Sequence, residues 1–247
     1  MPEWRNWSTR TIQNRLRVTS CGFKSHLRHK MTKHNLPLKK YTWTPELAYI
    51  IGLIATDGCL SSDGRHITFT SCDKQLVETF KRILKPENKI SKTDTRALRV
   101  QFSDIQFYKW LLSIGLTPAK SHTIGKISVP KEFFRDFIRG HLDGDGSITT
   151  YIDKYNTFKN QKYIYERLFV RFISASKKHI LWLQENIINE FGVKGRIHKS
   201  KIYKPSKVPI YILKFMKKES KKLLKEIYYE KSLPCLNRKR LVASKFF

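Results

Sequence analysis

The sequence predicts an α+β protein built from two similar halves, each in the order helix, two strands, helix, two strands, helix. Three observations carry this prediction. One nine-residue pattern occurs twice, runs of alternating apolar and polar residues follow each copy, and helical periodicity returns after each pair of strands. Because the paired strands are joined by short connections, we expect the sheets to be antiparallel.

The repeated pattern ends the first helix of each half. Residues 50–58 read IIGLIATDG and residues 138–146 read IRGHLDGDG. Pro45 and Pro130 precede the two stretches, so each is interpreted as a helix that starts at a proline and stops at an Asp-Gly pair. We call these two helices the signature helices. Small residues fall on one face of each, at Ala48, Gly52 and Ala55 and at Gly140 and Gly144. Since glycine inside a helix costs up to about 1 kcal/mol, we expect close helix-to-helix contact as compensation.

Two aspartates lie where these helices end. The partial negative charge of a helix C-terminus disfavours a carboxylate there by roughly 0.3 to 1 kcal/mol, yet Asp57 and Asp145 both occupy that position. When the same unfavourable placement of a carboxylate occurs at two matched positions, it indicates that these aspartates have a function. Side by side, the helix ends would place two carboxylates in one negative pocket, which a divalent cation with oxygen ligands would neutralise.

The rest of the first half follows from periodicity. Strands are expected over 59–62 and 65–71 around a turn at Asp63-Gly64, a helix over 73–84, a second strand pair that includes 98–103, and a short helix over 105–114.

The second half repeats this order. Strands are expected over 148–155 and 163–174 around a polar loop, a helix over 176–191, strands over 196–201 and 210–215, and a last helix over 218–229. The segments 115–121 and 233–240 occupy matched places after the last helix of each half.

The two nine-residue stretches resemble the paired signature of the LAGLIDADG homing endonucleases, in the form where one chain carries both copies. The first keeps Gly52 and Asp57-Gly58 but has Ala55 where the family name has aspartate; the second keeps Gly140, Asp143 and Asp145-Gly146. The two signature aspartates are 88 residues apart (145 − 57). The resemblance covers residues 41–247, which divides the chain into a first half (41–127), a second half (128–247) and a basic extension (1–40).

The resemblance implies a monomeric, intron-encoded endonuclease that makes a metal-dependent double-strand break in a long, specific duplex DNA target and leaves 3′ overhangs. It implies two halves packed through the signature helices, with antiparallel β-ribbons forming a saddle on the DNA. Asp57 and Asp145 would be catalytic metal ligands for Mg²⁺, with Mn²⁺ as a substitute, and backbone groups of Gly58 or Thr56 and of Gly144 are further candidates. Lys120 and Lys239 resemble the active-site lysines, and Ser71 and Ser174 stand where the family holds a solvent network.

Composition predicts the partner class. Lys+Arg 49 against Asp+Glu 20 gives a net charge of +29, which favours a polyanion. Polar side chains on the outward strand faces suit the major groove of duplex DNA. The candidate DNA contacts are Arg65, Thr68, Thr70, Arg99, Gln101 and Ser103 in the first half and Thr149, Tyr151, Arg167, Arg171, Arg196 and His198 in the second. For each, an ordinary solvated strand face is the alternative.

Other readings stay open at this point. A maturase that helps its host intron RNA fold, or a DNA-binding regulator on the same scaffold, would also be basic but would tolerate loss of Asp57 and Asp145. Asp143 is either an extra acid or a partner of Arg139 at four-residue spacing. Residues 1–40, with ten Lys/Arg and one acid, suit either a helix-turn-helix-like module or a basic arm that orders on DNA.

The sequence also excludes several classes. It has no apolar run of the roughly 18 residues needed to cross a bilayer and no visible signal peptide, so we expect a soluble, intracellular protein without a membrane partner. Its cysteines form no CxxC pair, which argues against a disulfide framework and a cysteine-rich zinc site; they are Cys21, Cys59, Cys72 and Cys235.

Overall fold

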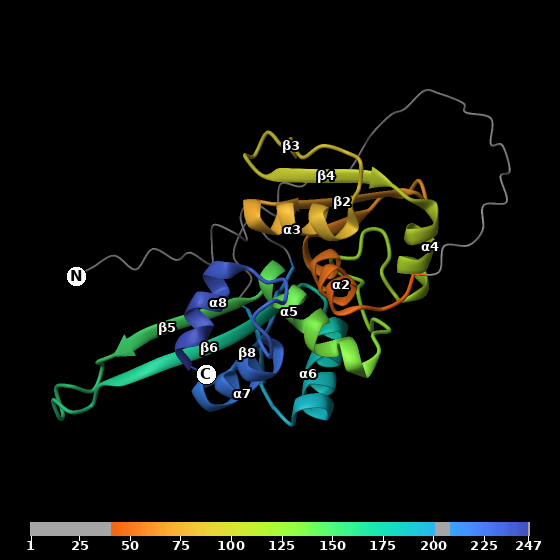
Figure 1. The fold of residues 1–247 in the computed structure, drawn as a ribbon. Helices are drawn as coiled ribbons and strands as arrows, with labels where there is room; N and C mark the ends of the chain where they lie inside the picture. Colours follow the sequence, from red (N-terminus) through yellow and green to blue (C-terminus); the bar gives the residue numbers. More distant parts are fainter. Residues whose placement is uncertain (1–40, 201–207, 247) are drawn as a thin grey trace, which may run out of the picture. The chain divides into compact units, whose positions relative to one another are not determined.

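The computed structural model describes residues 41–200 and 208–246. The expectations for residues 1–40, and for the last residue of the strand predicted over 196–201, lie outside this part of the chain. In the first half the elements are α2 (Pro45–Asp57), β1 (Gly58–Leu60), β2 (His66–Ser71), α3 (Lys74–Leu84), β3 (Ser91–Lys92), β4 (Leu98–Ser103) and α4 (Ile105–Ser113). They appear in orange to green in Figure 1.

The second half repeats the order (Figure 1). Its elements are the 3₁₀ turn η1 (Lys131–Phe133), α5 (Phe134–Gly144), β5 (Ser147–Asp153), β6 (Tyr165–Ser174), α6 (Lys177–Phe191), β7 (Arg196–Lys199), β8 (Tyr211–Phe215), α7 (Lys217–Ile227), α8 (Asn237–Ala243) and η2 (Ser244–Phe246). The predicted α+β repeat is confirmed, with two differences. The second signature helix opens with a 3₁₀ turn after Pro130, and the segment 233–240 runs into a short helix that periodicity did not predict.

Each half forms one four-stranded antiparallel sheet with the same topology. The strand order is β1-β2-β4-β3 in the first sheet and β5-β6-β8-β7 in the second. In β2, Ile67 and Phe69 are buried while Thr68 and Thr70 are only half-buried, as alternation predicts for a sheet with one covered face. The polar face of β2 is therefore the one turned away from the core.

The starts of the helices follow from their capping residues. Thr44 accepts a hydrogen bond at its Oγ1 from Leu47 N at 3.1 Å, directly before Pro45 at the first helical position of α2. Asp104 caps α4 in the same way through Phe107 N at 2.8 Å. Ser176 caps α6 through His179 N at 3.4 Å. Polar capping residues that directly precede apolar runs thus fix where the helices begin.

The signature helices α2 and α5 lie side by side at the centre of the core (Figure 1). Along α2 the residues from Ala48 to Ile54 are fully buried or nearly so, because the helix contacts α5 on one side and α3 and β2 on others. In the second half, α6 and α7 cover the apolar face of β6 and β8. The core therefore fixes the ends of α2 and α5 relative to both sheets.

Within the described residues, no helix combines the length and apolar character that crossing a bilayer requires.

Candidate active site

The two signature helices approach so closely that their glycines leave no room for a side chain. A Cβ added to Gly52 would lie 2.2 Å from the carbonyl oxygen of Phe137, and one added to Gly140 would lie 2.0 Å from that of Tyr49. These two contacts are equivalent, since each pairs a glycine of one helix with the matched residue of the other. The predicted close contact through small residues is confirmed for both glycines.

This packing brings the ends of the helices together. Asp57 is the last residue of α2, and Asp145 is the cap residue of α5, two turns from Phe137. A Cβ on Gly144 would lie 3.0 Å from Oδ2 of Asp57 and 2.0 Å from Oγ1 of Thr56. The carboxylate of Asp57 therefore lies against the backbone of the residue that precedes Asp145. Both aspartates are half-buried, so each is held by the fold but open to solvent.

The predicted lysines close the two helix ends at matched places. Lys120 donates from its Nζ to the carbonyl oxygen of Gly58, and Lys239 donates to that of Gly146 at 2.8 Å. Lys239 also donates to the carbonyl oxygens of Leu142 at 2.6 Å and Asp143 at 2.8 Å. Its three protons are thus directed at two carbonyl groups in the last turn of α5 and one just after the helix. Both lysines are buried.

The electrostatics of Lys239 connect it to both signature aspartates. Burial lowers the pKa of the Lys239 ammonium to about 8, while the negative charges of Asp143, Asp57 and Asp145 oppose that shift. The two signature carboxylates therefore act on the same ammonium group. Their position beside Lys239 agrees with the prediction that the helix ends gather these charges in one place.

The donor set suits a hard divalent cation. The described residues contain no group of three or more His, Cys, Asp or Glu side chains arranged to hold a metal. The carboxylates of Asp57 and Asp145 would supply oxygen ligands, which Mg²⁺ accepts together with water. Because Lys120 already engages the carbonyl oxygen of Gly58, that group is disfavoured as a ligand.

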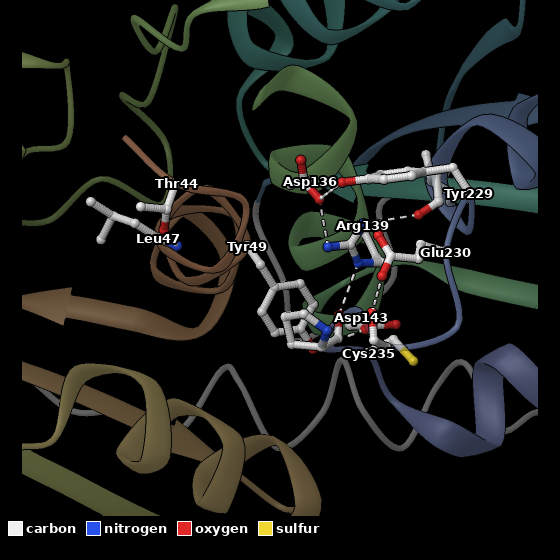
Figure 2. A network of polar contacts seen from close by, with 12 residues as sticks. Thr44, Leu47, Tyr49, Asp136, Arg139, Asp143, Tyr229, Glu230 and Cys235 are labelled. Carbon is white, nitrogen blue, oxygen red and sulfur yellow. Dashed lines mark hydrogen bonds and ion pairs between the residues drawn. The ribbon is translucent and has the colours of Figure 1, made fainter. Parts of the chain in front are cut away.

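Asp143 does not pair with Arg139, which was one of the two alternatives for this residue, and its carboxyl group instead connects separate segments of the fold. Its Oδ2 accepts hydrogen bonds from the hydroxyl of Tyr49 at 2.9 Å and from Leu236 N at 2.7 Å (Figure 2). Burial raises the pKa of its carboxyl group, although Lys239 and these hydrogen bonds oppose the shift. The hydroxyl and the amide thus bind the Asp143 side chain to α2 and to the segment before α8.

Arg139 instead pairs with Asp136 at 2.6 Å, one turn earlier on α5. It also donates to the carbonyl oxygens of Ile227 at 3.0 Å and Pro234 at 2.8 Å (Figure 2). The other guanidinium nitrogens thus donate to one carbonyl group at the end of α7 and one in the segment before α8. Of the two alternatives for Asp143, the pairing with Arg139 is therefore wrong, since the two side chains belong to separate hydrogen-bond networks.

Ser71 and Ser174 occupy equivalent turns. Each lies at the end of a strand and accepts a hydrogen bond at its Oγ from the backbone N–H two residues on, Asp73 for the first and Ser176 for the second, both at 3.1 Å. The alignment of the two strand-to-helix junctions is therefore correct. Their part in a solvent network remains a prediction.

The candidate DNA contacts of the first sheet lie on its outward face. Cross-strand pairs place Thr68 opposite Gln101 and Thr70 opposite Arg99, while Ser103 pairs with His66. His66 was not predicted, although its alternation with the buried Ile67 could have shown it. Arg65 lies in the turn before β2, where its side chain contacts Asp63 at 3.7 Å, so it does not belong to this strand face.

The candidates of the second sheet also share one face. Tyr151 pairs with Arg167, Arg171 with Lys214, and Lys214 with Arg196. Arg171 donates to Oγ1 of Thr149 at 3.1 Å. His198 lies opposite Ile212 on the same side. Lys214 is a functional candidate that was not predicted from the sequence; it alternates with the buried Leu213 and Phe215, which is a signal that local periodicity provides.

The comparisons with known proteins agree with this arrangement. Residues 44–105 match the family model of the LAGLIDADG-like domain. No match was found among curated protein sequences. The crystal structure of the I-LtrWI LAGLIDADG homing endonuclease bound to target DNA is 15% identical, with a TM-score of 0.53, and the match covers 82% of this chain and 89% of that one.

Two further structures show the same likeness. LAGLIDADG meganuclease I-AabMI bound to uncleaved DNA is 14% identical, with a TM-score of 0.54 and coverage of 82% of this chain and 92% of that one. Full-length DUF199/WhiA from Thermatoga maritima is 14% identical, with a TM-score of 0.50, and the match covers 84% of this chain and 63% of that one. At these identities the likeness shows the fold.

Proposed function

Since this chain contains a LAGLIDADG-like domain and has the fold of the LAGLIDADG homing endonucleases, we propose that it is a site-specific endonuclease acting on duplex DNA. The observation that carries the proposal is the presence of Asp57 and Asp145 at adjoining helix ends, beside the buried Lys239. A role limited to binding would leave two carboxylates of like charge together without a purpose.

Each group has a role in this proposal. Asp57 and Asp145 would hold Mg²⁺, with Mn²⁺ as a substitute, and a bound cation would supply the Lewis acidity for hydrolysis of the phosphodiester. Lys120 and Lys239 keep the two helix ends in shape by satisfying their carbonyl groups, and Lys239 adds positive charge where the scissile phosphates would lie. The outward faces of the two sheets would read the DNA.

The remaining details are part of the same proposal. The chain acts as a monomer, because one chain supplies both signature helices and both sheets. It cuts both strands and leaves 3′ overhangs, in the manner that the resemblance implies, and it is encoded within an intron. The proposal also divides the chain into three segments, an extension (1–40), a first half (41–127) and a second half (128–247).

A regulator or an intron RNA maturase on the same scaffold is the rival function. The likeness to WhiA shows that the fold occurs in a protein whose name does not describe a nuclease. The fold therefore does not decide between these functions. The presence of both aspartates favours the nuclease, because a protein that only binds would not need them.

The experiment is cleavage of a randomised duplex library in Mg²⁺, with Ca²⁺ as the metal control. The variants are Asp57→Asn/Asp145→Asn and, as a matched control, Glu185→Gln, which changes an exposed carboxylate on α6. We expect double-strand ends at one sequence for the wild type and the control, and none for the double variant. Tight duplex binding without cleavage by the wild type would favour the regulator instead.

A further inference from the structure

A row of aromatic rings and basic side chains runs along the outward face of the β5–β6 ribbon. The rings of Phe169 and Tyr151 are 6.0 Å apart, and the guanidinium of Arg167 lies 5.4 Å from the ring centre of Tyr165. The ring of Tyr163 stacks near that of Tyr165, at 6.2 Å and an interplanar angle of 25°. We call these five residues the ring row.

Strand register explains why the row is continuous. Tyr151 is paired with Arg167, and Asp153 with Tyr165, so these side chains project from the same face as Phe169. At the inner end, the Lys214 ammonium lies 3.9 Å and the Arg171 guanidinium 5.4 Å from the ring centre of Phe169. The rings of the row are therefore interleaved with cations along the length of the ribbon.

The three tyrosines of the row are presented to solvent, whereas Phe169 at its inner end is buried. Tyr151, Tyr163 and Tyr165 are between 40 and 46% exposed. In the connecting loop, Tyr155 is 81% and Phe158 74% exposed. Residues 154–165 include Lys154, Lys159 and Lys162 and no acid. The flanking acids are already paired, Asp153 with Arg167 at 2.9 Å and Glu166 with Lys217 at 3.0 Å. The surface therefore combines exposed rings with net positive charge.

The first sheet has no such row. Its outward face carries no Phe, Tyr or Trp among the described strand residues, and it consists of Cys59, His66, Thr68, Thr70, Ser91, Arg99, Gln101 and Ser103. Those groups suit hydrogen bonding to base edges in a groove. The two outward faces therefore differ in chemistry, although the two sheets share one topology.

We propose that the ring row binds unpaired nucleotides, with bases stacked on Tyr151, Tyr165 and Tyr163 and phosphates held by the neighbouring Arg and Lys side chains. In a duplex, the base faces are covered by their neighbours, so a groove offers these rings only base edges. Unpaired bases expose their π-faces, and aromatic side chains beside cations are the groups that bind them. The proposal goes beyond duplex cleavage: it adds single strands as a second ligand of a face that would contact the duplex in the proposed function, and its test does not depend on cleavage.

The test measures binding of labelled single strands by fluorescence anisotropy in EDTA, where cleavage cannot interfere. Oligonucleotides of the same base sequence in RNA and in DNA form the two arms. The variant Tyr163→Leu/Tyr165→Leu keeps apolar volume but removes both rings, and Tyr163→Phe/Tyr165→Phe keeps the rings. Both positions are on the surface, so thermal unfolding should be unchanged, which a melting curve checks.

We expect the leucine variant to bind at least one kind of single strand about tenfold more weakly than the wild type, and the phenylalanine variant to stay within about twofold. The arm with the larger ring-dependent loss identifies RNA or DNA as the source of the nucleotides. Equal affinity of the wild type and the leucine variant in both arms would overturn the proposal. Ring-dependent binding to anionic lipid vesicles without any effect on the single strands would also overturn it.

Discussion

The hydroxyl of Tyr49 on one signature helix donates a 2.9 Å hydrogen bond to the carboxyl group of Asp143 on the other. Both side chains are buried, and Oδ1 of Asp143 has no hydrogen-bond partner among the described residues. The two halves of the molecule are thus joined by a polar contact whose two buried groups cannot form hydrogen bonds with water instead.

Tyr49→Phe tests the strength of this contact. The change removes the hydroxyl and leaves the ring, so Asp143 keeps only the hydrogen bond from Leu236 N. We expect the free energy of unfolding to fall by about 1 to 3 kcal/mol, because a buried acceptor loses its donor. Urea denaturation measures the loss. An unchanged midpoint would show that Asp143 finds another donor.

Gly140→Ala tests the close approach of α2 and α5. The added methyl group would meet the backbone of Tyr49, which cannot move as a side chain can. We expect a loss of about 3 kcal/mol or more in the free energy of unfolding. The matched control is Gly125→Ala, where nothing lies within 4 Å of the new Cβ. Equal stability of the two variants would contradict the close contact.

Lys239→Met tests whether this lysine supports the end of α5. Methionine keeps most of the length of the lysine side chain but removes the three protons that satisfy the carbonyl groups of Leu142, Asp143 and Gly146. We expect stability to fall by about 2 kcal/mol or more. Lys225→Met, which changes an exposed lysine on α7, is the control. A role confined to phosphate contact would leave the stability of Lys239→Met at the control value.

His179 makes stability depend on pH. Burial lowers the pKa of its imidazole to about 4, with Lys120 acting in the same direction, while the hydrogen bond to the carbonyl oxygen of Gly125 opposes the shift. The ring of His141 also lies against it, with the two Nε2 atoms 3.0 Å apart. Below the ordinary histidine pKa of about 6.5, the unfolded chain takes up a proton that the folded chain refuses.

Stability is therefore full above about pH 6.5 and falls as the pH drops toward 4, by about 2 kcal/mol at pH 5. His179→Gln removes the titrating group, so its unfolding midpoint should change less between pH 7.5 and pH 5. Denaturation of both proteins at the two pH values measures the difference. Parallel losses in wild type and variant would assign the acid sensitivity to other groups.

Local signals in the sequence were enough to predict the helices and strands and to tell which strand residues face outward. Alternation placed Thr68 with Gln101 and Tyr151 with Arg167 on outward faces, because side chains change sides at every strand residue. Proline and the Asp-Gly pairs placed the ends of the signature helices, since backbone preference is local. The same reasoning could have added Lys214.

Contacts between distant segments could not be predicted in this way. The choice of Arg139 between Asp136 and Asp143 depends on carbonyl groups of Ile227 and Pro234, which lie 88 and 95 positions away in sequence. Lys239 is part of α8, and it likewise reaches its three carbonyl acceptors only when the chain folds so that α8 lies near the end of α5. Spacing along a helix offers both partners to Arg139, and only the tertiary structure chooses between them.

The polar contact between Tyr49 and Asp143 has no counterpart across the pseudo-twofold axis. The matched positions, 88 residues away in each case, are Phe137 and Ala55, both buried and apolar. A carboxyl group at position 55 would face a ring without a hydroxyl, which accounts for the alanine in the first signature helix. A pair of two first halves would have the tyrosine but no aspartate to accept its hydrogen bond. A pair of two second halves would have the aspartate but no tyrosine hydroxyl to donate to it. This hydrogen bond therefore favours contact between the two unlike halves over contact between two copies of the same half.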